Sequence, residues 1–174
     1  FGPAPGPVRA EVLHPWPGWA QGLEGRAVSR NNGSIVLRLS LGEVGFLLAG
    51  DIEEETEHRL VREGLLSETE VLKIPHHASN SSSSEALVEA LDPLVAVAGV
   101  GEGNRFGFPH ASVRARYLRR GTQLLWTGRH GSVQICTDGW ELQVLALRER
   151  GPGQELARFP ARETGERRAS APPA

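Results

Sequence analysis

The sequence predicts an α/β fold. Apolar runs of strand length alternate with helix-like segments through the middle of the chain, from about residue 34 to residue 126. At each end of this region, strand-like runs follow one another without a helix between them. Elements in this order form sheet layers with helices outside them, so we expect a three- or four-layer α/β architecture.

The bulk properties fit a single globular domain. The chain has 174 residues, 39% of them hydrophobic, which is enough to form a core. Its formal net charge is -2, so a contact with nucleic acid would need a local basic patch. The single cysteine, Cys136, excludes an internal disulfide and a cysteine-rich zinc site, and its neighbours predict a buried strand residue.

The ends of the chain point to a segment of a longer protein. The sequence contains no methionine and opens with Phe1-Gly2-Pro3, and no charged-then-apolar signal pattern follows. No apolar run approaches the roughly 18 residues that a membrane span requires. Residues 1–8 and 18–25 are rich in Gly or Pro and predict loops.

The expected strands begin with a hairpin. Ser34–Leu39 and Val44–Ala49 are strand-like runs with a Gly42 turn between them, and the second is apolar enough to be covered on both faces. A brief strand is expected at Val12–Leu13. The remaining expected strands are Val71–Ile74, Leu94–Val100, Gln123–Trp126, Ser132–Cys136 and Glu141–Leu147.

Three helices are expected between these strands. They run from about Ile52 to Arg62, from Ser84 to Leu91 and from Ser112 to Arg120. The first opens with acidic residues, which favour the positive end of the helix dipole. After Glu149 the composition shifts to Gly, Pro, Arg, Glu and Ala, so we assign residues 1–148 to the domain and 149–174 to a disordered tail or linker.

Asp51 is the first candidate site residue, because it ends the apolar run Phe46–Gly50. Open α/β sheets bind ligands at the carboxyl ends of strands, where a carboxylate can bridge metal ions. Alternatively, Asp51 is the N-cap of the following helix, with Glu54 completing a capping box. The carboxylate has two oxygens, so both roles remain open.

The adjacent histidines His76 and His77 follow the next strand and Pro75. An extended or turn geometry would point their rings at different targets, so that one binds a metal while the other contacts substrate or orients water. A surface pair without a role is the alternative. The serines at 81–84 are expected to cap the next helix through Ser82 or Ser83, and their N–H groups would also suit a phosphate.

The third candidate segment, Gly101–His110, again follows an apolar strand. Asn104 and Arg105 can hold an anionic oxygen, and His110 begins a helix. Taken alone, the segment is a turn-rich loop, but three such clusters at successive strand ends predict one shared site. The other histidines, His14, His58 and His130, are interpreted as having no catalytic role. Arg114, Arg116, Arg119 and Arg120 make a basic helix face, which is interpreted as solvated surface rather than as a nucleic-acid site.

Four segments, at residues 31–37, 48–52, 72–79 and 104–110, occur in an order and spacing that resemble ComEC-type competence proteins. The likeness is to the C-terminal metallo-β-lactamase-like domain of these DNA-uptake channels and extends from about Leu13 to Trp140. It implies an αββα sandwich, of which this chain is the C-terminal half or a part. Ala78 and Phe108 depart mildly from the family pattern. The family's upstream His-x-Asp/His-x-Asp-His metal motif is absent, leaving about half of a binuclear site.

The resemblance implies a metal-dependent phosphodiesterase, specifically a DNA nuclease. Two divalent ions, zinc or manganese, would activate water and neutralise charge on the scissile phosphate. The implied roles are metal binding for Asp51 with His76 or His77, catalysis and phosphate contact for His110, Arg105 and Asn104, and substrate binding for Ser79 and Asn80.

The implied partners are single-stranded DNA, the membrane channel domain of the same polypeptide and the upstream half of the domain. The implied location is the bacterial inner membrane as part of a larger protein, with this domain soluble on the outer face. We expect weak or no activity from the isolated fragment. Two alternatives remain: a non-catalytic module that guides DNA or packs on a channel, and a metallo-hydrolase of the same fold that acts on another ester.

Overall fold

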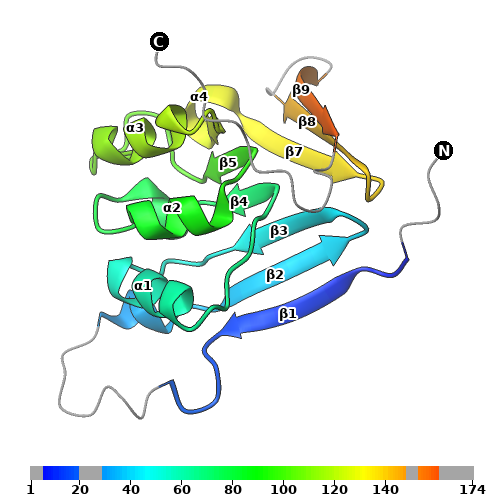
Figure 1. The fold of residues 1–174 in the computed structure, drawn as a ribbon. Helices are drawn as coiled ribbons and strands as arrows, with labels where there is room; N and C mark the ends of the chain where they lie inside the picture. The colour runs from blue at the N-terminus through cyan, green and yellow to red at the C-terminus, as the bar shows by residue number, and fades with distance from the viewer. Residues whose placement is uncertain (1–5, 20–28, 148–152, 161–174) are drawn as a thin grey trace.

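The structure is a computed structural model that describes residues 6–19, 29–147 and 153–160 (Figure 1). Within these ranges, one sheet has six strands in the order β1-β2-β3-β4-β5-β6, and a second has three strands in the order β7-β8-β9. Helices stand between the strands of the larger sheet along the chain. The predicted α/β class is therefore confirmed, while the αββα sandwich stays a prediction.

The strands of the larger sheet are β1 (Arg9–His14), β2 (Val36–Leu41), β3 (Val44–Leu48), β4 (Val71–Lys73), β5 (Val95–Ala98) and β6 (Gln123–Trp126). The smaller sheet consists of β7 (Ser132–Thr137), β8 (Glu141–Leu147) and β9 (Gln154–Pro160). The helices are α1 (Glu54–Arg62), α2 (Glu85–Leu91), α3 (Ala111–Arg119) and the short α4 (Thr127–His130). Two 3-10 helices, η2 (Arg30–Gly33) and η3 (Pro75–Ala78), complete the described elements.

The larger sheet is antiparallel at one side and parallel at the other. β1, β2 and β3 pair antiparallel, whereas β3, β4, β5 and β6 pair parallel. The predicted hairpin is the β2–β3 pair. Its turn requires a glycine, because a Cβ on Gly42 would lie 2.6 Å from the carbonyl oxygen of Gly139 in the β7–β8 turn.

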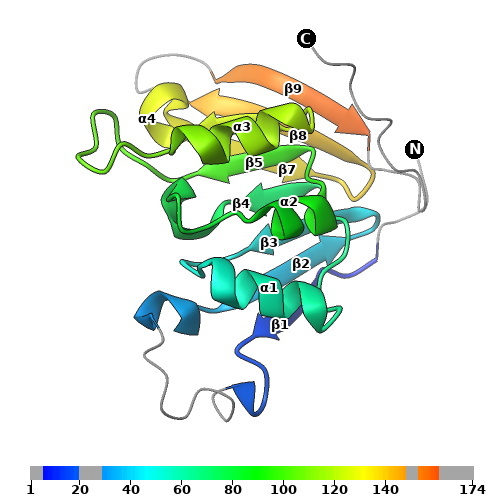
Figure 2. The same cartoon turned by 60° about the vertical axis from the view of Figure 1, so that its left-hand side comes forward.

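Alternating side chains give the larger sheet two buried faces. In β4 and β5, Leu72 and Ala96 belong to the cluster that the helices cover, while Val71 and Val95 belong to the cluster under the second sheet. Figure 2 shows α1, α2 and α3 lying side by side over one face. Their buried side chains in that cluster include Leu60 from α1, Leu87 and Leu91 from α2, and Val113 and Tyr117 from α3.

The three-stranded sheet packs on the opposite face through Leu142 and Val144 of β8 and Phe159 of β9. The described residues thus form three layers: helices, large sheet and small sheet. On β1 and β3, Val12 and Leu48 remain 56% and 38% exposed. Both lie in one cross-strand row, because each pairs with Leu37 of β2.

The strand β9 differs from the prediction that residues 149–174 form a disordered tail. Gln154–Pro160 pairs antiparallel with β8, and Leu156 and Phe159 pack into the core between the sheets. The few apolar residues of this segment are enough for an edge strand once β8 is there to pair with. Residues 161–174 lie outside the described ranges, as do most of the predicted loops at 1–8 and 18–25.

Two local predictions at helix ends are wrong. The helix α1 begins at Glu54, and Asp51 does not cap it; the side-chain oxygen of Asn32 accepts a 2.8 Å hydrogen bond from the Glu53 N–H instead. The cap of α2 is Ser84, whose hydroxyl accepts from the Leu87 N–H at 3.2 Å, and not Ser82 or Ser83.

A buried carboxylate joins α1 to α2. Glu57 is 0% exposed and accepts 2.6 Å hydrogen bonds from the backbone N–H groups of Ser83 and Ser84. Burial raises the pKa of Glu57, and these two hydrogen bonds oppose the shift. Glu57 is one of the acidic residues in the first turn of α1, as predicted, but its side chain is buried, and the N–H groups of Ser83 and Ser84 are already occupied.

The arginines of α3 are also more engaged than the sequence predicts. Arg116 donates to the carbonyl oxygens of Ser82 and Ser83, and Arg119 and Arg120 form ion pairs with Glu85 and Asp92. They hold α3 against the α2 segment. Within the described residues, no helix combines the length and apolar character needed to cross a bilayer.

The substitution Glu57→Gln should destabilise the fold, because an amide has only one oxygen with which to accept from two buried N–H groups. We expect the free energy of unfolding to fall by about 1–3 kcal/mol in urea denaturation. Glu55→Gln, an exposed neighbour on the same helix, is the matched control and should change it by less than about 0.5 kcal/mol. Equal effects of the two substitutions would contradict a role of the Glu57 carboxylate in joining α1 to α2.

Candidate functional site

The candidate residues gather at one edge of the large sheet. Because β3, β4 and β5 are parallel, their carboxyl ends lie at the same edge. Asp51 follows β3, His76 and His77 follow β4, and the loop from Gly99 to His110 follows β5. The antiparallel strand β2 begins at this edge, which brings η2 with Asn31 beside them. All three segments thus follow strands that end at this edge, and of the predicted metal ligands the structure brings Asp51 and His77 together, with 3.6 Å between Asp51 Oδ1 and His77 Nε2.

Asp51 lies between a lysine and a histidine. Its Oδ1 is 3.8 Å from Lys73 Nζ and 3.6 Å from His77 Nε2, and its side chain is 41% exposed. Lys73 also donates to the carbonyl oxygen of Gly50 at 3.1 Å. Burial lowers the pKa of the Lys73 ammonium, and the Asp51 carboxylate opposes that shift. Asp51 is thus accessible and oriented without being a helix cap.

The two nitrogens of His77 have different environments. Nδ1 donates a 2.6 Å hydrogen bond to the carbonyl oxygen of Gly99, which places the proton of a neutral ring on Nδ1. Nε2 then carries the lone pair and faces Asp51 at 3.6 Å. A histidine held in this way by a backbone carbonyl has the orientation and tautomer of a metal ligand.

His76 is held by protein groups at both nitrogens. Nδ1 lies 3.2 Å from Glu53 Oε1 and 3.3 Å from the Ser81 hydroxyl, and Nε2 lies 3.4 Å from the Asn31 side-chain nitrogen. A ring that donates from Nδ1 to Glu53 and accepts at Nε2 from Asn31 satisfies these contacts. The rings therefore do point to different targets, and only His77 turns a lone pair toward Asp51.

The backbone separates the two rings. His76, His77 and Ala78 have φ values of 44°, 54° and 64°, all in the left-handed region that residues with a Cβ rarely adopt. Each such residue costs on the order of 1–2 kcal/mol. The turn is held by hydrogen bonds from Ser79 N–H to the His76 carbonyl (2.9 Å) and from His110 N–H to the Ala78 carbonyl (2.9 Å). Retained strain of this kind is a feature of functional sites.

His110 caps α3 and lies next to this turn. Its Nδ1 accepts from the Ser112 N–H at 3.4 Å and lies 2.8 Å from the Ser112 hydroxyl. A ring that accepts at Nδ1 carries its proton on Nε2, so His110 offers a hydrogen-bond donor. This suits contact with an anionic oxygen better than metal ligation.

In the loop after β5, Asn104 and Arg105 were both predicted to hold an anionic oxygen, but the structure gives them different contacts. The Asn104 amide donates to the carbonyl oxygens of Gly101 and Phe108 and accepts from the Phe108 N–H at 3.0 Å, so it closes the loop. The Arg105 guanidinium lies 4.9 Å from the ring centroid of Phe106. Of the two, Arg105 is exposed, whereas Asn104 is half-buried.

The two residues predicted to bind substrate, Ser79 and Asn80, also differ in their exposure. Ser79 is 5% exposed, and its hydroxyl lies 3.2 Å from that of Ser81, whereas Asn80 is exposed. The other histidines stand apart from the site. His14 is buried against Trp16 and Trp19, His58 pairs with Glu54 on α1, and His130 contacts Trp126.

Three residues at the site were not selected from the sequence: Asn31, Glu53 and Lys73. Glu53 was interpreted as one of several dipole acids, and only its 3.2 Å contact with His76 distinguishes it. Asn31 and Lys73 lie inside the segments that resemble the competence proteins, and this position could have marked them as candidate site residues. Among the residues that the structure describes, no three His, Cys, Asp or Glu side chains form a group that could hold a metal ion.

Comparison with known proteins gives competence and recombination proteins as relatives. The chain is 33% identical to ComE operon protein 3 of Bacillus subtilis over 106 residues, which is 61% of this chain and 14% of that protein. It is 35% identical to competence protein ComA of Neisseria gonorrhoeae over 113 residues (64% and 16%). It is 34% identical to recombination protein 2 of Haemophilus influenzae over 105 residues (60% and 13%). None of the family models compared matches the chain.

The chain is a homologue of a segment of the ComEC-type competence proteins. The resemblance inferred from the four sequence segments is confirmed by these relatives. The matched region spans only 13% to 16% of the length of these three proteins.

The buried His14 predicts that the stability of the fold depends on pH. Its Nε2 donates to the Asn32 carbonyl at 2.7 Å, its Nδ1 is buried without a hydrogen-bond partner, and burial lowers its pKa. The folded state therefore favours the neutral ring, while the unfolded chain takes up a proton near pH 6.5. Stability is fully present above that pH and is lost as the pH falls through it, by up to about 1.4 kcal/mol per pH unit.

Urea denaturation of the wild type and His14→Gln between about pH 7.5 and 5.5 checks this expectation. The glutamine can still donate to the Asn32 carbonyl but does not titrate, so its unfolding free energy should depend less on pH. His58→Gln removes an exposed histidine and should keep the wild-type slope. An unchanged slope in the His14 variant would be inconsistent with a buried neutral ring.

Proposed function

We propose that this segment forms one side of a metal-dependent phosphodiesterase centre, of the DNA nuclease type, in a protein of bacterial DNA uptake. The names of the relatives associate them with competence and recombination. The observation that carries the catalytic proposal is the pair of Asp51 and His77, with a carboxylate 3.6 Å from an imidazole nitrogen whose partner nitrogen is bound to a backbone carbonyl.

The donor set fits part of a metal centre. Aspartate oxygen and neutral imidazole nitrogen are ligands that both zinc and manganese accept. Two donors are too few for a closed site, and the described residues supply no group of three. We therefore place the remaining ligands in the upstream half of the domain. When bound at the complete centre, two divalent ions would lower the pKa of a water molecule and neutralise charge on a phosphodiester.

The two histidines take different roles in this proposal. His77 is the ligand, because its Nε2 lone pair faces Asp51. His76 positions the loop, because Glu53 and Asn31 occupy both of its nitrogens. His110 and Arg105 steady phosphate oxygens, the first as an Nε2–H donor and the second as an exposed guanidinium.

The surface proposed for contact with the upstream half of the domain is an apolar row that the described residues leave partly exposed. The apolar row of Val12, Leu37 and Leu48 lies on the face of the large sheet that β7–β9 cover only in part. We propose that the upstream half of the domain packs there. The channel domain of the same polypeptide would hold the assembly at the bacterial inner membrane, with this domain on its outer side, and single-stranded DNA would be the substrate.

Zinc binding to the 174-residue chain distinguishes the roles of the histidines. We expect Asp51→Asn and His77→Ala to weaken binding at least about tenfold in competition with a chromophoric chelator, because each removes a donor. His76→Gln should stay within about threefold, and His58→Gln should match the wild type. If His76→Gln abolished binding while His77→Ala did not, the assignment of the ligand would be reversed.

Cleavage of a labelled single-stranded oligonucleotide by the longer parent protein tests the activity itself. With manganese or zinc present, we expect cleavage that chelation removes and that Asp51→Asn lowers by about a hundredfold or more. The 174-residue chain alone should show weak or no turnover. Substantial metal-dependent turnover by that chain would contradict an incomplete centre.

A non-catalytic role is the second candidate, and the small number of converging donors favours it. In that case the segment guides DNA or packs against the channel, and the parent protein would cleave neither DNA nor other esters. Hydrolysis of another phosphodiester or a thioester in place of DNA would instead keep the metal centre and change the substrate.

A further inference from the structure

Lys73 is the single lysine of this chain. All the others of its 19 lysine and arginine residues are arginines. Lys73 ends β4, shortly before the turn that carries His76 and His77, and its side chain is 32% exposed. An ammonium is a compact donor, whereas a guanidinium is a planar fork of several donors that spreads over more space. A lysine at this one position indicates that the site uses the shape of the ammonium as well as its charge.

The Lys73 ammonium is bound to the turn that carries Asp51. Its Nζ donates a 3.1 Å hydrogen bond to the Gly50 carbonyl oxygen. The distance from Nζ to Asp51 Oδ1 is 3.8 Å, which is longer than a hydrogen bond. The ammonium therefore places a positive charge beside the carboxylate but does not use the carboxylate oxygen as its hydrogen-bond acceptor.

The Gly50 carbonyl joins the two turns of the site. The same oxygen accepts from the His76 N–H at 3.2 Å, so two donors from the β4 segment converge on it. Gly50 has a φ of 58°, and a Cβ there would lie 2.7 Å from Ser34 Cβ and 2.9 Å from the Ile35 carbonyl oxygen. The turn therefore requires glycine in order to direct this carbonyl toward β4.

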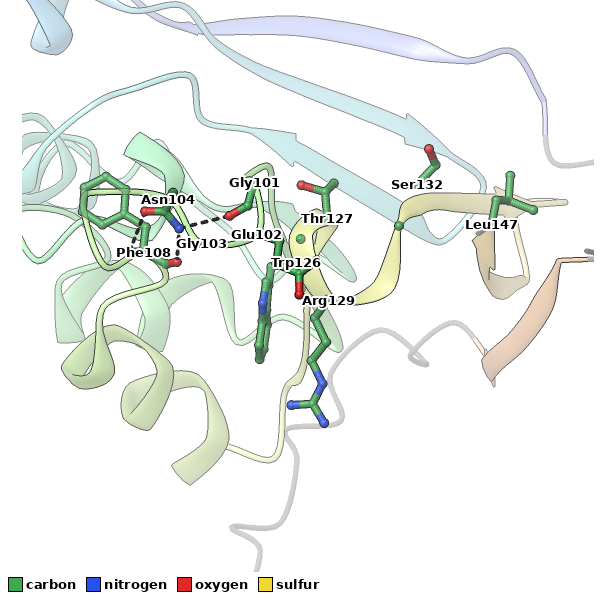
Figure 3. A pocket seen from close by; sticks show the side chains of 12 residues that line it. Gly101, Glu102, Gly103, Asn104, Phe108, Trp126, Thr127, Arg129, Ser132 and Leu147 are labelled. Atoms are coloured by element: carbon green, nitrogen blue, oxygen red, sulfur yellow. Dashed lines mark hydrogen bonds between the residues drawn. The ribbon is translucent and has the colours of Figure 1, made fainter. Parts of the chain in front are cut away.

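His77 is supported from the other side, by the loop after β5. Its Nδ1 donates to the Gly99 carbonyl at 2.6 Å. The loop that follows Gly99 lines, together with α4, a cavity of about 750 Å³ at the carboxyl ends of β5 and β6 (Figure 3). Asn104 closes this loop through hydrogen bonds with Gly101 and Phe108, which Figure 3 draws as dashed lines. The His77 ring is thus anchored independently of the turn at Gly50.

The Asp51 carboxylate is anchored differently. Among the residues that the structure describes, none donates a hydrogen bond to it, and the groups beside it are Lys73 Nζ and His77 Nε2. Its orientation therefore depends on the Gly50–Asp51 turn. Lys73 is the side chain that binds this turn, through the Gly50 carbonyl.

We propose that Lys73 is a positioning residue of the metal centre, whose ammonium binds the Gly50 carbonyl and thereby holds the Asp51 carboxylate opposite His77 Nε2. This role rests on the proposed function, in which Asp51 and His77 are ligands. Lys73 itself contacts neither metal nor substrate in this role. Loss of a partner that orients a ligand typically costs about tenfold to a hundredfold in metal affinity.

Zinc binding to the 174-residue chain, measured by competition with a chromophoric chelator, tests this role. We expect Lys73→Met to weaken binding about tenfold, because the side chain keeps an apolar stem but no longer donates to Gly50. Lys73→Arg should weaken it at least about threefold although the charge is kept, because the guanidinium has a different shape. Arg38→Met is the matched control: Arg38 is also half-buried on the large sheet and donates to a backbone carbonyl, that of Leu65, at 2.9 Å. It should leave the affinity within about twofold of the wild type.

Two further variants separate positioning from a general effect on charge or fold. In a Cys136→Ala background, Lys73→Cys can be alkylated with bromoethylamine in the unfolded state and refolded, which restores an ammonium on a side chain of the same length. Zinc affinity should return to within about threefold of the Cys136→Ala chain. Added to Asp51→Asn, Lys73→Met should weaken binding by less than about twofold more, because its effect passes through Asp51.

Nuclear magnetic resonance of the chain in EDTA tests the lysine contact without metal. Because Lys73 is the single lysine, labelling with ¹³C-lysine gives one set of side-chain signals. We expect its two Cε protons to differ in chemical shift, since the ammonium is held against the Gly50 carbonyl. The backbone amide signal of Asp51 should move in both Lys73→Met and Lys73→Arg and return when the ammonium is restored.

Thermal unfolding of each variant separates a loss of binding from a loss of fold, and Lys73→Met should unfold at about the temperature of Arg38→Met. The proposal is overturned if the Cε protons are equivalent as in free lysine, if Lys73→Met binds zinc as tightly as the wild type or more tightly, or if Arg38→Met weakens binding equally. A wild-type chain that bound no zinc would refute the metal centre, and the signals in EDTA would still decide whether Lys73 holds the Asp51 turn.

Discussion

Parallel pairing of β3, β4, β5 and β6 is the constraint on which the rest of this structure depends. Three parallel strands that each end in a polar segment must present those segments at one edge, whatever the segments contain. The helices cover one face of the sheet and the small sheet covers the other, and the candidate site residues lie at that edge. Asp51 and His77, 26 positions apart in the numbering, meet there at 3.6 Å.

The left-handed turn at His76–Ala78 gives the two adjacent histidine rings different contact partners. In a regular strand, adjacent rings would point to opposite faces of the sheet. Here φ values of 44° and 54° direct one ring to Glu53 and Asn31 and the other to Gly99 and Asp51. The strain is offset by backbone hydrogen bonds from Ser79 and His110 that the turn itself makes possible.

Two local sequence patterns, at Asp51 and at Glu57, predicted the right type of residue at a helix start but not the contact that the structure shows. The sequence around Asp51 is a good capping box, yet the helix begins three residues later, where Asn32 from η2 accepts from the Glu53 N–H. Glu57 matches a helix-dipole residue, yet it is buried against Ser83 and Ser84. In both cases a contact with a distant segment replaced the local one, because a buried N–H requires an acceptor wherever it is found.

The sequence by itself determined the α/β class, the strands and helices of the middle of the chain, the three polar clusters at strand ends and the relation to competence proteins. These depend on hydrophobic periodicity and on contiguous motifs, which a linear chain displays directly. Only the tertiary structure decided which imidazole nitrogen keeps a lone pair, which acid is buried, that β9 forms, and that the loop after β5 and α4 enclose a cavity. Each of these depends on contacts between residues far apart in the chain, such as His77 with Gly99 and Gly128 with Glu102, which no local pattern encodes.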